Sequence, residues 1–264
     1  MKTRKIDERA AAIVDAICYW LGYQYKIGRE KLIHEASLRY PIADTLTSKE
    51  IRINQIVLEK LHPIFKSKRI DLVVFNEDVS AGEFEKDDSR LNEVYEFKLV
   101  RAQTAEKEKE EHQRVFDDVV RLAYYNLWRK KKCYFLMCGK YDDFKAYFVG
   151  EKAKINFEYG RNIVSVKHPS LSKPSFIPIV EAWRSSGIYK DWFSFDVNGE
   201  KRIVFDKKIE WGLETFQNNY KIRENLQNQF KTEIEVKTTC LAITPNELLN
   251  RTHAAGIWKI EGIK

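Results

Sequence analysis

The chain has 264 residues, and its 46 lysines and arginines outnumber its 39 aspartates and glutamates, for a formal net charge of +7. Hydrophobic residues at 44% and aromatic residues at 13% can fill a core, which excludes a globally disordered protein. The longest apolar run, Ala10–Leu21, is about half as long as the roughly 20 residues of a membrane helix and contains Asp15. No apolar secretion signal follows the basic N-terminus. We therefore expect a cytoplasmic protein without a membrane partner.

The charge alone leaves two interpretations open, a polyanionic partner or a solvated surface of mixed charge. The four cysteines form no Cys-x-x-Cys pair, which argues against a zinc ribbon or a thioredoxin-like motif. The five histidines show no His-x-His or His-x-x-x-His spacing, which argues against a histidine metal site. We expect reduced, partly buried thiols.

The first part of the chain has the periodicity of three helices. Apolar residues recur at helical spacing between Asp7 and Trp20, and Asp7 is suited to cap the start. A second helix is predicted over Glu30–Tyr40, ending near Pro41 because the residue before a proline avoids the helical region. A third is predicted over Ser48–Leu61, with Ser48 as its N-cap.

The period then changes to that of strands. Strands are predicted over Arg69–Phe75 and Leu91–Val100, separated by a polar loop over Asn76–Arg90. A long amphipathic helix over Thr104–Arg129 and a buried strand over Lys132–Cys138 follow. The order predicts a mixed α/β fold with an antiparallel hairpin inside it.

The second half of the chain is predicted to elaborate this core. Residues 1–150 are interpreted as the core and 151–264 as an extension packed on the same domain, which would serve recognition or dimerisation. Further strands are predicted over Lys145–Val149, Asn162–Val166, Arg202–Phe205, Glu233–Ile243 and Ile257–Ile260, and helices over Ile209–Gln229 and Pro245–Leu249.

The hairpin carries the residues that suggest chemistry. Glu96 and Lys98 are two residues apart and therefore project from the same face of their strand. If the two strands pair antiparallel, the midpoint between Asp71 and these residues is about residue 84, inside the predicted loop. Asp71 would then lie across from Glu96 and Lys98, at the end of the hairpin remote from the loop.

This arrangement suits one divalent ion, with Asp71, Glu96 and the backbone carbonyl of Phe97 as ligands and water completing an octahedron. Hydrolysis of a phosphodiester needs an acidified water and a group that stabilises charge on the phosphate, and Mg²⁺ supplies both. Lys98 would position the water or stabilise the transition state. The alternative is a strand face of alternating charge, with cross-strand pairs that stabilise by under about 1 kcal/mol.

The run Arg69-Ile70-Asp71 followed by Glu96-Phe97-Lys98 resembles the PD-(D/E)XK nuclease superfamily, over about residues 30–138. The resemblance implies a restriction-endonuclease-like core, a mixed β-sheet flanked by helices, and metal-dependent cleavage of nucleic acid. Ile70 stands where the motif has a proline. The family often adds an acidic residue from the preceding helix, and Glu35 is favoured for that role over Glu30.

Further candidates contact nucleic acid rather than metal. The helix after the Glu-x-Lys motif contributes residues in many relatives, and here Gln113 could contact phosphate, while Asp117, Asp118 and Arg121 are equally suited to ion pairs within the helix. The remaining candidates are basic residues near the carboxylates in sequence, namely Lys68, Arg69, Arg101, Lys130 and Lys131.

The sequence thus predicts a Mg²⁺-dependent endonuclease, with Mn²⁺ as a possible substitute, that cleaves DNA in restriction or phage defence. A homodimer is expected, because one such site cuts one strand and two-fold symmetry matches a duplex. Three alternatives stay open: an inactive nucleic-acid-binding module of the same fold, an RNA-directed nuclease, and an interaction protein that binds no nucleic acid.

Overall fold

A computed structural model describes residues 7–65, 68–80, 88–100, 105–141, 156–160, 163–167, 175–178, 192–206, 233–244 and 252–263. Within these ranges, only the backbone is described for 105–113, 156–178, 205–206 and 233.

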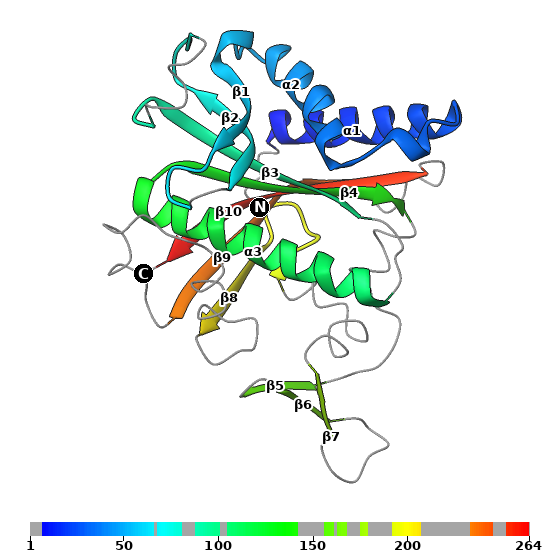
Figure 1. Ribbon diagram of the computed structural model, residues 1–264, viewed down its shortest axis with the longest axis vertical. Coiled ribbons are helices and arrows are strands. Elements are labelled where there is room, and N and C mark those ends of the chain that lie inside the picture. The colour runs from blue at the N-terminus through cyan, green and yellow to red at the C-terminus, as the bar shows by residue number, and fades with distance from the viewer. Residues whose placement is uncertain are drawn as a thin grey trace, which may run out of the picture.

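A seven-stranded sheet in the order β1–β2–β3–β4–β10–β9–β8 forms the centre of the protein (Figure 1). The strands β3 and β4 run parallel and all other neighbouring pairs are antiparallel, so the sheet is mixed. The strands are β1 (Ile56–Leu61), β2 (Arg69–Phe75), β3 (Leu91–Val100), β4 (Lys132–Lys140), β8 (Glu200–Asp206), β9 (Glu233–Ile243) and β10 (His253–Ile263).

Helices cover both faces of this sheet (Figure 1). The helices α1 (Glu8–Lys26) and α2 (Arg39–Thr47) lie on one face, and α3 (Ala105–Arg129) lies on the other. The helix α3 connects β3 to β4, since two parallel strands need a crossover rather than a tight turn. Each face of the sheet therefore has its own hydrophobic core, and β3 contributes to both.

The first helix shows why its sequence folds where it does. The Asp7 carboxylate accepts a hydrogen bond from the backbone N–H of Ala10 at 2.9 Å, which caps the helix start as predicted. Ile13, Ile17 and Leu21 recur every four residues and are completely or almost completely buried against the sheet. The prediction of a helix from Asp7 is confirmed, and the helix continues six residues beyond Trp20 to Lys26.

The predicted core elements after residue 68 are also confirmed. The hairpin strands are β2 and β3, the long helix is α3, and the following strand is β4. All four cysteines are buried and free.

The helix predicted over Ser48–Leu61 is wrong. Ser48 is the C-cap of α2, where its N–H donates to the carbonyl of Asp44, and a short 3-10 turn, η3 (Ile53–Gln55), precedes strand β1. Ile56–Leu61 instead forms a strand that pairs with β2 on both sides of Glu59. Tertiary pairing of the β-branched residues overrides a helical spacing that the sequence also permits.

The helix predicted over Glu30–Tyr40 is also wrong. This segment forms two short 3-10 turns, η1 (Glu30–Leu32) and η2 (Glu35–Leu38), and α2 begins at Arg39 and runs through Pro41. Proline is tolerated in the first turn of a helix, because the N–H that it lacks would have no partner within the helix. Pro41 therefore marks a helix start rather than an end.

In the second half, strands β8, β9 and β10 extend the same sheet beyond β4. A second, three-stranded antiparallel sheet contains β5 (Asn156–Gly160), β6 (Ile163–Lys167) and β7 (Ser175–Pro178). The predicted strands over Asn162–Val166, Arg202–Phe205, Glu233–Ile243 and Ile257–Ile260 are thus confirmed. Those over 145–149 and the helices over 209–229 and 245–249 lie outside the described residues. No helix in the described ranges is long and apolar enough to cross a membrane.

Candidate active site

The hairpin pairs antiparallel, as predicted, and its register places the candidate residues side by side. Leu72 lies opposite Tyr95 and Val73 opposite Val94, so the same register continued by one residue sets Asp71 opposite Glu96. The N–H of Phe97 donates to Oδ2 of Asp71 at 2.9 Å. The predicted juxtaposition of Asp71 with the Glu-x-Lys motif is therefore confirmed.

Asp71 is held from a second side by Arg39, the first residue of α2. The Nη2 atom of Arg39 lies 2.8 Å from Oδ1 of Asp71 and 2.5 Å from Oε1 of Glu59. Glu59 belongs to β1 and has a φ of 56°, which is uncommon for a residue other than glycine. The guanidinium thus links two carboxylates that come from neighbouring strands.

Glu96 is 3% exposed and lies beneath helix α3. The Nη2 atom of Arg121 lies 3.2 Å from Oε1 of Glu96 and also pairs with the carboxylate of Asp118, one turn earlier in α3. Burial raises the pKa of Glu96 well above its ordinary value, and the negative charges of Asp71 and Asp118 raise it further, while Arg121 opposes the change. The site therefore favours a proton or another cation beside Glu96.

Lys98 is 5% exposed, and its Nζ lies 3.0 Å from Oε2 of Glu35 in η2. The predicted accessory carboxylate, Glu35, is thus brought to the predicted lysine even though it lies on a 3-10 turn rather than on a helix. A lysine side chain has several rotatable bonds, and the ion pair with Glu35 restrains them. The ammonium is therefore held at the edge of the carboxylates.

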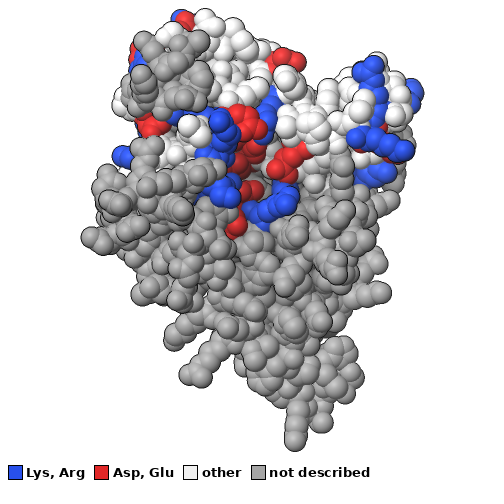
Figure 2. All heavy atoms as spheres, viewed as in Figure 1, with Lys and Arg blue, Asp and Glu red and all other residues white. Residues whose placement is uncertain are grey.

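The pKa of Asp118 also reflects a surplus of negative charge at this position. Burial, together with the charges of Glu35 and Asp71, raises the pKa of Asp118 to about 7, against the opposing effect of Arg121 and Lys98. We call the described carboxylates and cations at this position the carboxylate cluster; they are Glu35, Arg39, Glu59, Asp71, Glu96, Lys98, Asp118 and Arg121. Figure 2 shows acidic and basic side chains gathered near the upper centre of the view. Carboxylates outnumber cations in the cluster.

Asp71 and Glu96 are carboxylates, the type of ligand that Mg²⁺ prefers, but the described side chains do not form a closed set of ligands. Among the described residues, no three histidine, cysteine, aspartate or glutamate side chains come together as a group that could hold a metal ion. Mg²⁺ is often bound by only one or two carboxylates, with water and substrate phosphate as the other ligands. Asp71 and Glu96 meet that requirement, but Arg39 and Arg121 occupy two of their oxygens.

No protein-family model, no curated protein and no solved structure matches this chain.

The predicted nucleic-acid contacts are divided between two ends of the sheet. Arg69 is exposed at the start of β2 and donates to the carbonyl of Glu59 at 2.6 Å, which places it beside the carboxylate cluster. Lys68 precedes it and is half-buried. The side chain of Gln113 and all of Arg101 lie outside the described residues, although Gln113 is part of α3.

Lys130 and Lys131 lie at the other end. Lys131 donates to the carbonyl of Ser89 at 3.0 Å, and the next residue, Lys132, pairs with Glu93 across the sheet, five positions along β4 from the partner of Lys98. The structure does not bring these two lysines to the carboxylate cluster.

Sequence reasoning missed Arg39 and Glu59, and it favoured an ion pair within the helix for Arg121 and Asp118 over a role in the site. That ion pair exists, but Arg121 also contacts Glu96. A signal for this was present, since Arg121 is a charged residue between buried positions of an amphipathic helix. Glu59 gave no such signal, because its role depends on a strand that was predicted as a helix.

Proposed function

We propose that this protein is a divalent-metal-dependent endonuclease that hydrolyses phosphodiester bonds in DNA. The observation that carries the proposal is the pair of the half-buried Asp71 and the buried Glu96 on neighbouring strands, with Lys98 on the same strand as Glu96. Carboxylates buried with a surplus of negative charge are costly unless a cation joins them. A nuclease would use this surplus of negative charge to bind a metal ion together with the phosphate of its substrate.

Each residue has a role that follows from its contacts. Asp71, Glu96 and the carbonyl of Phe97 would hold Mg²⁺, or Mn²⁺ in its place. When bound, the ion supplies an acidified water and positive charge at the phosphate. The ammonium of Lys98 orients the attacking water or stabilises charge that develops on the phosphate, and Glu35 restrains that ammonium.

The arginines position the carboxylates. Arg39 and the N–H of Phe97 fix both oxygens of Asp71, and Arg121 fixes one oxygen of Glu96. Ion binding would require Arg39 to release Oδ1 of Asp71 or to share it. We infer that Arg39 then turns toward substrate phosphate, for which a guanidinium is well suited.

The topology around the site supports the resemblance to the PD-(D/E)XK superfamily. An antiparallel hairpin, a crossover helix and a parallel strand follow one another as β2, β3, α3 and β4. We extend the proposal to a restriction-endonuclease-like fold, a cytoplasmic role in restriction or phage defence, and a homodimer that cuts both strands. The three strands that residues 200–263 add to the sheet are available for recognition or dimerisation.

The competing function is a non-catalytic nucleic-acid-binding module. One observation favours it: Arg39 and Arg121 already supply positive charge to the two carboxylates. A protein that had given up catalysis would retain such pairs and need no ion.

The deciding experiment incubates supercoiled plasmid and single-stranded RNA with the protein in Mg²⁺, in Mn²⁺ and in EDTA. We expect plasmid nicking or linearisation with either metal and none in EDTA. Asp71→Asn and Lys98→Met should abolish it, whereas the exposed controls Asp44→Asn and Lys49→Ala should cut like the wild type. Cleavage by Asp71→Asn at the wild-type rate would refute the site, and cleavage of RNA alone would change the substrate.

A further inference from the structure

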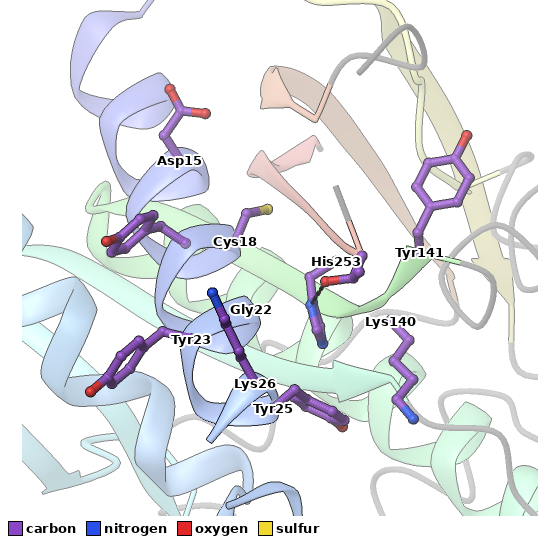
Figure 3. Close-up of a pocket in the computed structure, with 11 residues that line it drawn as sticks. Asp15, Cys18, Gly22, Tyr23, Tyr25, Lys26, Lys140, Tyr141 and His253 are labelled. Atoms are coloured by element: carbon purple, nitrogen blue, oxygen red, sulfur yellow. Dashed lines mark hydrogen bonds between the residues drawn. The ribbon is translucent and has the colours of Figure 1, made fainter. Parts of the chain in front are cut away.

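A cavity whose lining includes none of the carboxylates of the candidate site lies at one end of the sheet. Its volume is about 930 Å³, near the upper end of the range of small-ligand sites, roughly 300–1,000 Å³. The last half of α1, the end of β4 and the start of β10 enclose it (Figure 3). We call it the tyrosine pocket, because the side chains of Tyr19, Tyr23, Tyr25 and Tyr141 line it.

Aromatic rings and amines lie together in this pocket. The rings of Tyr25 and His253 are 4.5 Å apart between centroids, and Nζ of Lys140 lies 4.9 Å from the centroid of Tyr25. Lys26 adds a second amine, while Asp15 lies at the far side of the opening from Lys140 (Figure 3). Such a combination suits a ligand with a flat π-system and a negative charge.

Among the described residues, one of the two ring nitrogens of the buried His253 has no hydrogen-bond partner. The residue is 2% exposed, and its Nδ1 lies 2.8 Å from Oγ1 of Thr252, but Nε2 is buried without a hydrogen-bond partner among the described residues. Burial, together with the charge of Lys140, lowers the pKa of His253 to about 4, so the imidazole is neutral at pH 7. A buried polar atom without a partner is rare in folded proteins, and a ligand is one way to satisfy it.

Two tyrosines extend the pocket toward solvent. Tyr19 is 80% exposed and Tyr23 is 52% exposed, and both belong to the same face of α1 as the pocket. Large aromatic side chains left in water on one face commonly mark a binding surface. An extended ligand that continues past the pocket would cover them, whereas a small isolated metabolite would not.

The tyrosine pocket also adjoins the carboxylate cluster. Lys98 is paired with Met137 on β4, and Lys140 lies three residues further along that strand, a backbone separation of roughly 10 Å. Because three is an odd number of positions, the two lysine side chains leave opposite faces of the sheet. Lys140 and Lys98 are moreover approached by acidic residues of one short segment, Glu30 at 4.0 Å and Glu35 at 3.0 Å. A strand of nucleic acid that passes from the cluster around this end of the sheet would reach the pocket within a few nucleotides.

We propose that the tyrosine pocket receives an unpaired nucleotide of a single-stranded segment of the nucleic-acid substrate. The base stacks on Tyr25, its edge pairs with Nε2 of His253, and the flanking phosphates lie against Lys26 and Lys140. This inference rests on the proposed nuclease function, because that function supplies a nucleic acid at the neighbouring cluster. Stacking on aromatic residues accepts any base, so the contact confers strandedness rather than sequence preference.

The test measures binding in EDTA, so that no cleavage is required. Fluorescence anisotropy gives the Kd of fluorescein-labelled oligodeoxythymidylate, and one 2-aminopurine in a second oligonucleotide reports stacking by quenching of its emission. Tyr25→Leu, which keeps an apolar side chain but removes the ring, should raise the Kd roughly fivefold to a hundredfold and abolish the quenching. Lys140→Ala should raise the Kd and reduce its dependence on salt.

The controls are Tyr40→Leu, which removes an exposed ring on α2 outside the pocket, and Lys49→Ala; both should bind like the wild type. Weak binding in the pocket variants, with no cleavage by the wild-type protein in any metal, would refute the nuclease and retain the pocket. Unchanged Kd values in Tyr25→Leu and Lys140→Ala, together with cleavage that depends on Asp71, would overturn the pocket and retain the nuclease. Failure of the wild-type protein to bind the oligonucleotide would also overturn the proposal for the tyrosine pocket.

Discussion

Two glutamates on strand β3 have nearly the same burial and different surroundings. Glu93 is 2% exposed and Glu96 is 3% exposed, and because they are three residues apart their side chains project from opposite faces of the strand. Glu93 accepts a hydrogen bond from the hydroxyl of Tyr95 at 2.8 Å and pairs with Arg9 at 2.9 Å and Lys132 at 3.5 Å. It has two cations and a hydroxyl for one carboxylate.

Glu96 has the opposite balance. Its arginine, Arg121, is shared with Asp118, and Asp71 lies across the hairpin. Burial and these negative charges raise the pKa of Glu96 well above its ordinary value. Burial alone therefore does not mark a functional carboxylate. The distinguishing feature is whether neighbouring cations balance the negative charge of the carboxylate. At Glu96 they do not, because Arg121 is shared with Asp118.

The largest effect that would test this comparison is on catalysis. We expect Glu96→Gln to reduce the rate of plasmid cleavage by about a thousandfold, because it removes a charge that holds the ion where the transition state needs it. Glu93→Gln should retain the wild-type rate per folded molecule, as judged by circular dichroism. Equal loss of cleavage in both variants would show that the two carboxylates do not differ in the way proposed.

The second effect is on the free energy of unfolding, for which we expect Glu93 to matter more than Glu96. In EDTA, Glu93→Gln should lower the free energy of unfolding by about 2–3 kcal/mol, because two cations lose their partner and Tyr95 loses a charged acceptor. Glu96→Gln should lower it by less or raise it, since a neutral side chain relieves repulsion with Asp71. Urea denaturation monitored by fluorescence measures both, and the comparison fails if Glu96→Gln is the more destabilised variant.

How much of the site the sequence predicts depends on whether a contact follows from a local repeat or from tertiary packing. Asp71, Glu96 and Lys98 could be found because alternation along a strand and the symmetry of a hairpin are local properties. Arg39 and Glu59 could not, because the first reaches Asp71 from a helix 32 residues earlier and the second belongs to a strand whose spacing also suits a helix. Such contacts are set by tertiary packing, which overrides local preference.

The fold shows the same division. The hairpin, α3 and β4 follow from strong local periodicity, whereas the pairing of β10 with β4 joins residues more than a hundred positions apart. No local pattern records that pairing. The surroundings of Glu93 could not be predicted for the same reason, since Arg9 of α1 and Lys132 of β4 meet at this carboxylate only in the folded protein.

The third effect is a pH dependence of stability at the crowded cluster. Burial raises the pKa of Asp118 from its ordinary value of 3.8 to about 7, so the folded protein holds a proton there that the unfolded chain has released. Stability of the metal-free protein from this group therefore falls as the pH rises from 3.8 to about 7. Asp118→Asn should therefore be more stable than the wild type at the top of this range and equally stable at its bottom.

Thermal denaturation in EDTA at several pH values gives that difference, and the exposed Asp44→Asn provides the control. A gain that does not change with pH would mean that Asp118 acts through packing rather than through its charge.

The smallest effect should come from the ion itself. A ligand that binds only the folded protein stabilises it by RT ln(1 + [L]/Kd), which is about 1.4 kcal/mol at a concentration ten times the Kd. Added Mg²⁺ should therefore raise the melting temperature of the wild type and of Glu93→Gln, but not of Asp71→Asn, which has lost a charged ligand. Na⁺ at matched ionic strength separates this effect from screening. If Mg²⁺ stabilises Arg39→Ala more than the wild type, the arginine competes with the ion for Asp71, and the positive charge missing at Glu96 is supplied from solution. A melting temperature that Mg²⁺ leaves unchanged in every variant would instead favour a binding module, in which Arg39 and Arg121 have permanently replaced the metal.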